Sequence, residues 1–310
     1  MKNVFKIFII LNTFFTAFNV HANALDASFQ TELTAHLKVL SSNEYAGRKP
    51  GTKGHQQAQR YIEQNFTITT PRNVYNPLQV QTFNYRQGFT DKQGKNFIFT
   101  QIGSKYPSKY IVITAHYDHL GKQRGKIFNG ADDNASGTAM LMTLKSWLAR
   151  KTLSHSIMLV ATDAEESGFH GAKHFLDSNY IDAQDIKLNL NLDMVAHGYK
   201  QKGLYVVGLK NYPQFTDIIE KLNQQTTIEF KARERIVSKQ AGTLKQRINL
   251  HKASDHYQFH LRGIPYIFLT GDNHKYYHTD KDTFEKIDLK FFNDAFIAIN
   301  QLILMIDSDF

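Results

Sequence analysis

The chain has 310 residues, 42% of them hydrophobic, and a formal net charge of +9. This length suits one large domain or two small ones, and the composition is ordinary for a globular protein. Cysteine is absent and histidine occurs 14 times, which excludes disulfide bonds and cysteine-ligated metal sites. Any metal site must therefore be built from His, Asp and Glu.

The first residues have the pattern of a secretory signal peptide. A short basic start precedes a mostly apolar stretch over residues 7–20, and small residues flank a predicted cleavage site after Ala24. The apolar stretch is too short to cross a bilayer comfortably. We therefore expect residues 1–24 to be removed, no stable membrane anchor to remain, and an exported protein, periplasmic or secreted, to begin at Leu25.

The rest of the chain alternates predicted helices and strands. Helices are expected over residues 28–40, 54–66, 135–150, 169–178, 213–223 and 289–305, and strands over residues 78–85, 96–102, 110–115, 156–161, 186–192, 204–207 and 264–269. This order indicates an α/β fold of three α/β/α layers, in which helices flank a central mixed, mostly parallel sheet. Residues 25–310 are expected to form a single domain.

The stretch over residues 231–254 is the least regular part of the chain. Between Lys231 and Lys252 it holds seven Lys and Arg residues against one acid, Glu234. Few aromatic residues are interleaved to stack on nucleic-acid bases. We interpret it as a long, solvated loop near a functional site, and we expect no nucleic-acid partner.

Polar clusters follow the predicted buried strands. "YIVITA" ends in His116-Tyr117-Asp118-His119, "SIMLVA" in Asp163, Glu165 and Glu166, "IKLNLNL" in Asp193, and "IPYIFL" is followed by His278. A fifth cluster, "GADDNASG", lies between a strand and a helix. In open α/β sheets the binding crevice lies at the carboxyl ends of the strands, so these clusters are expected to converge.

This set of side chains favours a pair of metal ions. Two histidines and at least three carboxylates from distant segments suit two divalent cations, and a carboxylate with two oxygens can bridge them. One of the two adjacent residues Glu165 and Glu166 can then bind a metal. The other can stay free as a base that takes a proton from water.

The motifs resemble those of a known family. "HYDHLG", "GADDNASG", "DAEESG", "NLDM" and "YHT" occur in this order in the di-zinc aminopeptidases of the bacterial leucyl aminopeptidase type. The early "GRKPGTKGHQQAQRYI" and the later "SDHYQF" also look like family segments, so the resemblance covers essentially the whole mature chain. It implies two Zn²⁺ ions and peptide substrates with a free N-terminus.

The resemblance also implies a role for individual residues. His116 and Asp193 resemble ligands of the first zinc, Glu166 and His278 ligands of the second, and Asp133 the bridging carboxylate. Glu165 resembles the general base, and Asp118 the acid that orients the His116 imidazole. Asp255 occupies another acidic position near the site.

Other acids and histidines are interpreted as structural. His170 and His174 follow Glu166 at helical spacing, but no HExxH pattern is present, and an exposed helix face explains them better. His119, His256 and His260 are expected to be hydrogen-bonded scaffold or rim groups. Asp163 is expected to form a turn or to lie behind the ligands, and Asp132 is not the usual ligand.

Alternative functions remain open at this stage. A glutaminyl cyclase, a single-zinc acyltransferase with a similar site, usually has DSA where this chain has "DNASG" and Trp before the last His, where this chain has Tyr277. A carboxypeptidase or other amidohydrolase of related fold is a further alternative. A non-catalytic binding domain should lack a ligand or the base, and none is missing here.

Overall fold

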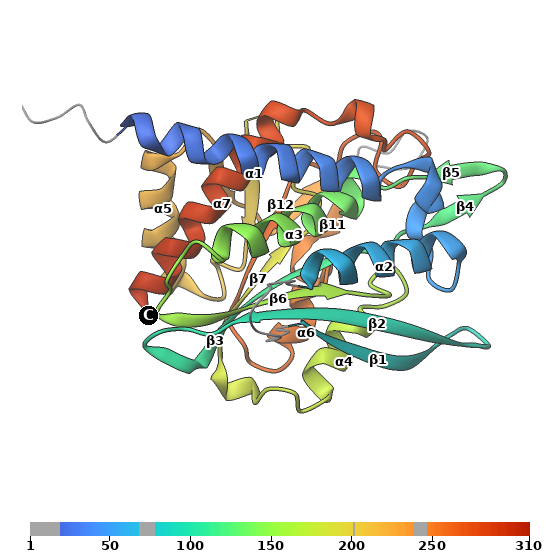
Figure 1. Ribbon diagram of the computed structural model, residues 1–310, viewed down its shortest axis with the longest axis horizontal. Helices are drawn as coiled ribbons and strands as arrows, with labels where there is room; N and C mark the ends of the chain where they lie inside the picture. The colour runs from blue at the N-terminus through green and yellow to red at the C-terminus, as the bar shows by residue number, and fades with distance from the viewer. Residues whose placement is uncertain (1–18, 68–77, 201, 238–246) are drawn as a thin grey trace, which may run out of the picture.

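Figure 1 shows a computed structural model of the chain that describes residues 19–67, 78–200, 202–237 and 247–310. Most of the predicted signal peptide, residues 1–18, lies outside the described residues. The helices are α1 (Asn19–Leu40), α2 (Lys53–Phe66), α3 (Gly137–Leu148), α4 (His170–Asp177), α5 (Thr216–Gln225), α6 (His256–His260) and α7 (Leu289–Asp309). The strands are β1 (Leu78–Gln87), β2 (Thr90–Gln101), β3 (Tyr106–His116), β4 (Gly121–Gln123), β5 (Lys126–Phe128), β6 (His155–Thr162), β7 (Ile186–Leu192), β8 (Gly203–Val207), β9 (Glu229–Ala232), β10 (Arg235–Val237), β11 (Arg247–Asn249) and β12 (Tyr266–Thr270).

Eight of these strands form one mixed sheet in the order β1-β2-β6-β3-β7-β12-β8-β9. The four central strands, β6, β3, β7 and β12, are mutually parallel, and β2 and β8 flank them in the antiparallel direction. Every residue of β6 is buried, because helices cover both faces of a central parallel strand. The predicted α/β class with three layers is confirmed.

Two crossovers place helices on opposite faces of the sheet. The chain runs from β3 through α3 to β6, and then back past β3 through α4 to β7. Because crossovers between parallel strands are right-handed, this reversal puts α3 and α4 on different faces. In Figure 1, α1, α2, α3, α5 and α7 lie on one side of the sheet, and α4 and α6 on the other. A crevice is expected at the carboxyl end of β3, where the strand order reverses.

Helix α1 begins earlier than the sequence predicted, at Asn19 rather than at position 28. Its described buried apolar side chains are Phe29, Leu33, Leu37 and Leu40, spaced three or four residues apart on one face. They belong to the main hydrophobic core together with residues of α3 and α7. The helix therefore continues through the predicted cleavage site, and these four side chains all follow that site.

Helix α7 closes the chain and is the one helix among the described residues that is long and apolar enough to cross a membrane. Within its most apolar window, 56% of the residues are buried inside the protein. Phe292, Phe296, Ile299 and Ile303 are at most 1% exposed and belong to the main core. The high hydropathy of α7 is therefore explained by its position in the hydrophobic core.

The stretch over residues 231–254 is more ordered than the predicted long loop. It holds the end of β9 and the strands β10 and β11, which pair antiparallel with Ile236 opposite Ile248. Residues 238–246, between these two strands, lie outside the described residues. Strands of three residues are too short to produce a recognisable alternating pattern, which is why the sequence did not reveal them.

Candidate metal centre

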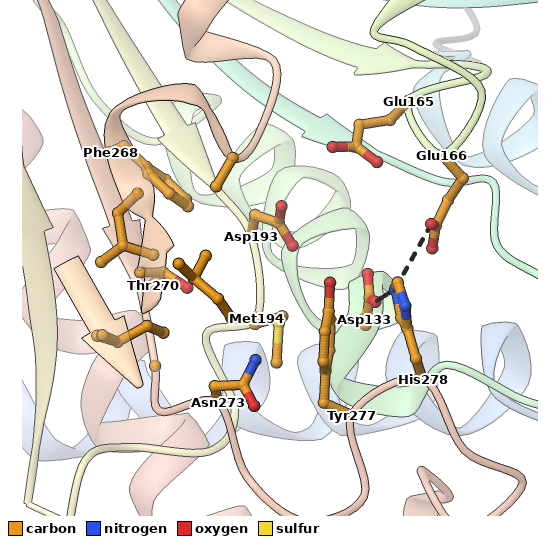
Figure 2. Close-up of a pocket in the computed structure, with 15 residues that line it drawn as sticks. Asp133, Glu165, Glu166, Asp193, Met194, Phe268, Thr270, Asn273, Tyr277 and His278 are labelled. Carbon is orange, nitrogen blue, oxygen red and sulfur yellow. Dashed lines mark ion pairs between the residues drawn. The ribbon is translucent and has the colours of Figure 1, made fainter. Parts of the chain in front are cut away.

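Five segments bring acids and histidines together at the carboxyl edge of the sheet. They are the segments that follow β3, β6, β7 and β12 and the turn that precedes α3. Figure 2 shows Asp133, Glu165, Glu166, Asp193 and His278 around one space. The predicted convergence of these strand ends is confirmed.

Asp133 lies between two groups of possible ligands. Its Oδ1 atom is 3.5 Å from His116 Nε2, which is itself 3.4 Å from Asp193 Oδ1. The other oxygen, Oδ2, is 3.0 Å from His278 Nε2, which is 3.5 Å from Glu166 Oε2. Ligands bound to a tetrahedral zinc ion at about 2.0–2.2 Å lie about 3.3–3.6 Å from one another. The side chains therefore fit zinc without large movements.

The turn before α3 is shaped to direct Asp133 inward. Gly130 has a φ of +58°, and a Cβ atom there would lie 2.1 Å from the Asp133 carbonyl oxygen, so this position requires glycine. The Asp282 carboxylate accepts the amide hydrogen of Asp133 at 3.1 Å. Asn134 Oδ1 accepts the Gly137 amide at 2.9 Å, which caps the start of α3 with a side-chain oxygen.

Asp118 positions the adjacent glutamates through the backbone. Its carboxylate accepts the amide of Glu165 at 3.0 Å and that of Glu166 at 3.3 Å. The Nδ1 atom of His116 lies 3.1 Å from the Asp118 carbonyl oxygen and 3.7 Å from its carboxylate. A proton on Nδ1 leaves Nε2 free to bind a metal. Asp118 therefore contacts His116, as expected, but mainly through its carbonyl group.

The two glutamates have opposite electrostatic surroundings. Burial raises the pKa of Glu165 well above its ordinary value, and the negative charges of Glu166 and Asp193 add to the rise against the opposing effect of His116. Burial also acts to raise the pKa of Glu166, but hydrogen bonds to His119 and His278 outweigh it and hold that pKa well below the ordinary value. Glu165 thus favours holding a proton, and Glu166 favours the ionised form of a ligand.

His119 has a larger part in the site than the sequence indicated. Its Nδ1 atom lies 2.8 Å from Glu166 Oε1 and 3.8 Å from Asp133 Oδ2. Glu166 is therefore held between His119 on one oxygen and His278 on the other. The prediction of a scaffold or rim group was incomplete. In the sequence, the position of His119 in the "HYDH" cluster was the one feature that linked this residue to the site.

A buried arginine that the sequence analysis did not single out ties the segments of the site together. The side chain of Arg48 is 0% exposed. Its guanidinium donates hydrogen bonds to the carbonyl oxygens of Leu40, Tyr117, Asn129 and Gly130 at 2.7–2.9 Å. Burial lowers its pKa to about 10, against the raising effect of nearby acids such as Asp133. Arg48 therefore stays charged and joins the segments before Asp118 and Asp133.

Asp163 and Asp255 are buried acids beside the metal centre. Asp163 accepts a hydrogen bond from the Tyr117 hydroxyl at 2.6 Å and lies 2.8 Å from His55 Nε2. It is a scaffold group, as expected. Asp255 accepts a hydrogen bond from Thr162 Oγ1 at 2.5 Å, and burial raises its pKa to about 7.

Three of the remaining histidines pack against aromatic rings. His170 stacks on Tyr85 and His174 on Phe83, with ring centroids 4.6 Å and 4.9 Å apart. Both are partly buried under β1, so the expectation of an exposed helix face was wrong. His260 lies 3.0 Å from the Tyr212 hydroxyl, as expected of a scaffold group.

The pocket has an acidic end and an apolar end. In Figure 2, Glu166 and His278 lie on one side, and Phe268 and Met194 on the other. Further apolar walls come from Leu250 and from Ile236 and Ile248 of the β10–β11 pair. The pocket therefore offers metal-binding groups beside a space suited to an apolar side chain.

Curated relatives match the chain over part of their length. An aminopeptidase of Bacillus subtilis, YwaD, is 28% identical over 216 residues, which cover 65% of this chain and 42% of the relative. The alkaline phosphatase isozyme conversion protein of Escherichia coli is 28% identical over 203 residues, covering 58% of this chain and 55% of the relative. The chain spans about half the length of the curated relatives it matches.

Solved structures match over nearly the whole chain. A glutaminyl cyclase of an Acidobacteriales bacterium has a TM-score of 0.71 at 21% identity, covering 98% of this chain and all of that one. The zinc aminopeptidase BSAP of Bacillus subtilis has a TM-score of 0.66 at 15% identity, covering 87% and 94%. At such identities these likenesses establish the shared fold.

The match to a protein family covers most of the catalytic segments described above. Residues 96–303 match peptidase family M28. This range includes every predicted ligand, the two adjacent glutamates and the walls of the pocket. The resemblance found in the sequence motifs is thereby confirmed: the chain belongs to peptidase family M28.

Proposed function

We propose that this chain is an exported di-zinc aminopeptidase that hydrolyses the N-terminal peptide bond of peptides. The observation that carries the proposal is the position of Asp133, whose two oxygens face different histidines at 3.5 Å and 3.0 Å. A carboxylate placed in this way suits two metal ions about 3.5–4 Å apart. His116 and Asp193 would hold one ion, and Glu166 and His278 the other.

Glu165 is the proposed general base. Bound zinc polarises a carbonyl group and lowers the pKa of water. Glu165 Oε2 lies 3.9 Å from His116 Nε2, beside the ligands. From this position Glu165 would take the proton of the attacking water and then pass it to the leaving amine. Glu166 would stay ionised and hold its metal.

The pocket supports a preference for peptides with an apolar first residue. Carboxylates at its acidic end attract the positive α-amine of a free N-terminus. Beside them, Met194, Ile236, Leu250 and Phe268 form an apolar wall that would bury the first side chain. Together these features favour removal of residues such as leucine, methionine or phenylalanine.

A glutaminyl cyclase-like acyltransferase is the second candidate. The fold likeness to the Acidobacteriales cyclase, which covers that chain completely, supports it. Against it, the proposed ligands would hold two metals rather than one, and Tyr277 precedes His278 at the position where glutaminyl cyclases usually have Trp. A carboxypeptidase or another amidohydrolase has no specific observation in its favour.

A kinetic comparison tests the proposal. Purified protein is assayed for amine release from leucyl-p-nitroanilide and for cyclisation of a glutaminyl peptide, with the Glu165→Gln variant as a control for contaminants. We expect amine release that a chelator abolishes and added zinc restores. Cyclisation without amine release would favour the second candidate and overturn the first.

Export is part of the same proposal. The signal-peptide pattern before Ala24 supports it. So does the fact that Phe29, Leu33, Leu37 and Leu40, the described core residues of α1, would all remain after cleavage. Removal of residues 1–24 would then leave the packing of these side chains in place.

A further inference from the structure

A second group of histidines and acids lies next to the proposed zinc centre and contains none of its proposed ligands. His197 comes from the loop after β7, His274 from the loop after β12, and Asp282 from the loop before α7. One ligand atom from each residue lies within 4.8 Å of the others. The neighbouring Asp132 approaches this group, with Oδ2 3.1 Å from His274 Nε2.

The side chains of this group differ from those of the proposed zinc centre, although the Asp282 carboxylate accepts the backbone amides of both Asp132 and Asp133, at 3.0 Å and 3.1 Å. Asp133 contacts His116 and His278. Asp132 instead contacts His274 and accepts the Ala196 amide at 2.8 Å through Oδ1. The Asp133 carboxylate therefore belongs to the proposed zinc centre, and the Asp132 carboxylate lies beside the second group.

One polar atom of the group has no partner among the described residues. His197 Nε2 is buried, with less than 1 Å² of exposed surface, and makes no hydrogen bond. A buried polar atom without a partner costs free energy. The ring of His197 lies 4.1 Å, centroid to centroid, from that of His274. The carboxylates of Asp132 and Asp282, both 0% exposed, lie in the same cluster.

The hydrogen bonds of His274 also suit a ligand. Its Nε2 atom pairs with Asp132, as carboxylates do beside metal-binding imidazoles. Its other nitrogen, Nδ1, then carries a lone pair, which accepts a hydrogen bond from the Tyr276 amide at 3.2 Å. Binding of a cation would exchange that contact for a metal–nitrogen bond. The His274 side chain is 12% exposed, so an ion can enter from the surface.

We propose that His197, His274 and Asp282 form a further binding site for a divalent transition metal, with Asp132 orienting His274. Two imidazole nitrogens and a carboxylate are a donor set that suits zinc. The site is structural, because it joins the loop that follows Asp193 to the loop that leads to His278. The Asp272 amide already donates to the His197 carbonyl at 2.8 Å, and a metal would add a side-chain link between the same loops.

The zinc content of the protein reports whether this site is occupied, and it requires no activity assay. Protein saturated with zinc and then desalted is analysed for zinc per chain in the wild type and in His197→Gln. The matched control is His174→Gln, which replaces a partly buried histidine outside both clusters. We expect one equivalent fewer in His197→Gln and no change in His174→Gln. Equal zinc content in the wild type and His197→Gln would overturn the proposal.

A variant that lacks the histidines of the proposed catalytic centre tests the further site separately. In the double variant His116→Ala, His278→Ala, that centre loses a histidine from each half, and we expect the protein to keep one equivalent of zinc. Adding His197→Gln should remove it. A double variant that binds no zinc while its circular dichroism spectrum stays native would contradict the further site, whatever the activity of the wild type.

Discussion

Glu165 and Glu166 follow one another after β6, and their carboxylates meet different partners. Glu165 lies beside His116 and among other acids, so burial and negative charge raise its pKa. Glu166 lies between His119 and His278, which lower its pKa. Acid and base roles in enzymes are often assigned by surroundings that push two pKa values apart in this way.

The variant Glu165→Gln should keep its metals and lose activity. The amide has nearly the shape of the carboxylate but does not accept the proton of water. We expect kcat to fall by about 10²–10⁴-fold, the usual contribution of a positioned general base. Steady-state kinetics with zinc analysis of the same sample measure both quantities. Near-normal kcat in metal-replete protein would show that another residue is the base.

Glu166→Gln is the matched comparison, because it makes the same chemical change one residue later. It removes a proposed ligand rather than a base. We expect weaker binding of one zinc equivalent, with activity partly restored by added zinc. Full zinc content at low free zinc would contradict the ligand role of Glu166.

Metal binding should release protons. Burial acts to lower the pKa of His278, but Asp133 and Glu166 outweigh it and raise that pKa to about 10. In metal-free protein this pairing stabilises the fold fully below the unfolded pKa of about 6.5, and the stabilisation is lost as the pH rises through about 10. Zinc must displace the proton, so its affinity should increase as the pH rises towards 10.

Calorimetry measures this release. Zinc titrations at pH 7 in two buffers of different ionisation enthalpy should give different heats, and His278→Gln should release fewer protons than the wild type. Identical heats in both buffers would contradict the assignment of His278 as a protonated group that becomes a ligand.

At the scale of elements, the β10–β11 pair supplies one wall of the pocket. Ile236 is 8% exposed and lines the pocket, whereas its neighbour Val237 is 45% exposed. Successive side chains of a strand point to opposite faces, so the same short strand presents one residue to the pocket and the next to solvent.

Ile236→Ser should therefore weaken the use of apolar substrates. Loss of apolar contact in a pocket changes specificity by about 10–200-fold, and we expect kcat/KM for a leucyl substrate to fall within that range while an alanyl substrate changes much less. The control is Val237→Ser on the exposed face, which should leave both substrates unaffected. Equal effects of the two variants would show that Ile236 does not contact the first side chain.

At the scale of the whole molecule, the proposed export has a defined product. If residues 1–24 are removed, the chain begins at Leu25 and its net charge falls from +9 to +7, because that segment holds two lysines and no acid. Mass spectrometry of protein from the periplasm or the medium should show Leu25 as the first residue. An intact Met1 on membrane-retained protein would contradict the cleavage.

Two variants near the predicted cleavage site test its position. Ala24→Leu places a large side chain where small residues are required and should slow processing. Ala27→Leu makes the same change three residues later, in the described part of α1, and should not. Equal processing of both variants would place the cleavage elsewhere.

The sequence by itself determined the fold class, the family and the segments that form the site. Apolar runs such as "YIVITA" and "SIMLVA" mark buried strands, and their carboxyl ends must meet because parallel strands end at one edge of a sheet. The patterns placed His116 and Asp193 at these ends, and the family resemblance of their motifs named them as predicted ligands. The same holds for the scaffold role of Asp163, which follows β6.

Only the tertiary structure decided what each side chain meets. Nothing in the spacing of "HYDH" shows that His119 contacts Glu166, or that Arg48 reaches the Gly130 carbonyl across 82 positions of the chain. The cluster of His197 with His274 likewise joins loops that are far apart in sequence. Side-chain periodicity reports which face of its own element a residue lies on, whereas these contacts depend on the direction in which loops leave the sheet, and long-range packing sets that direction.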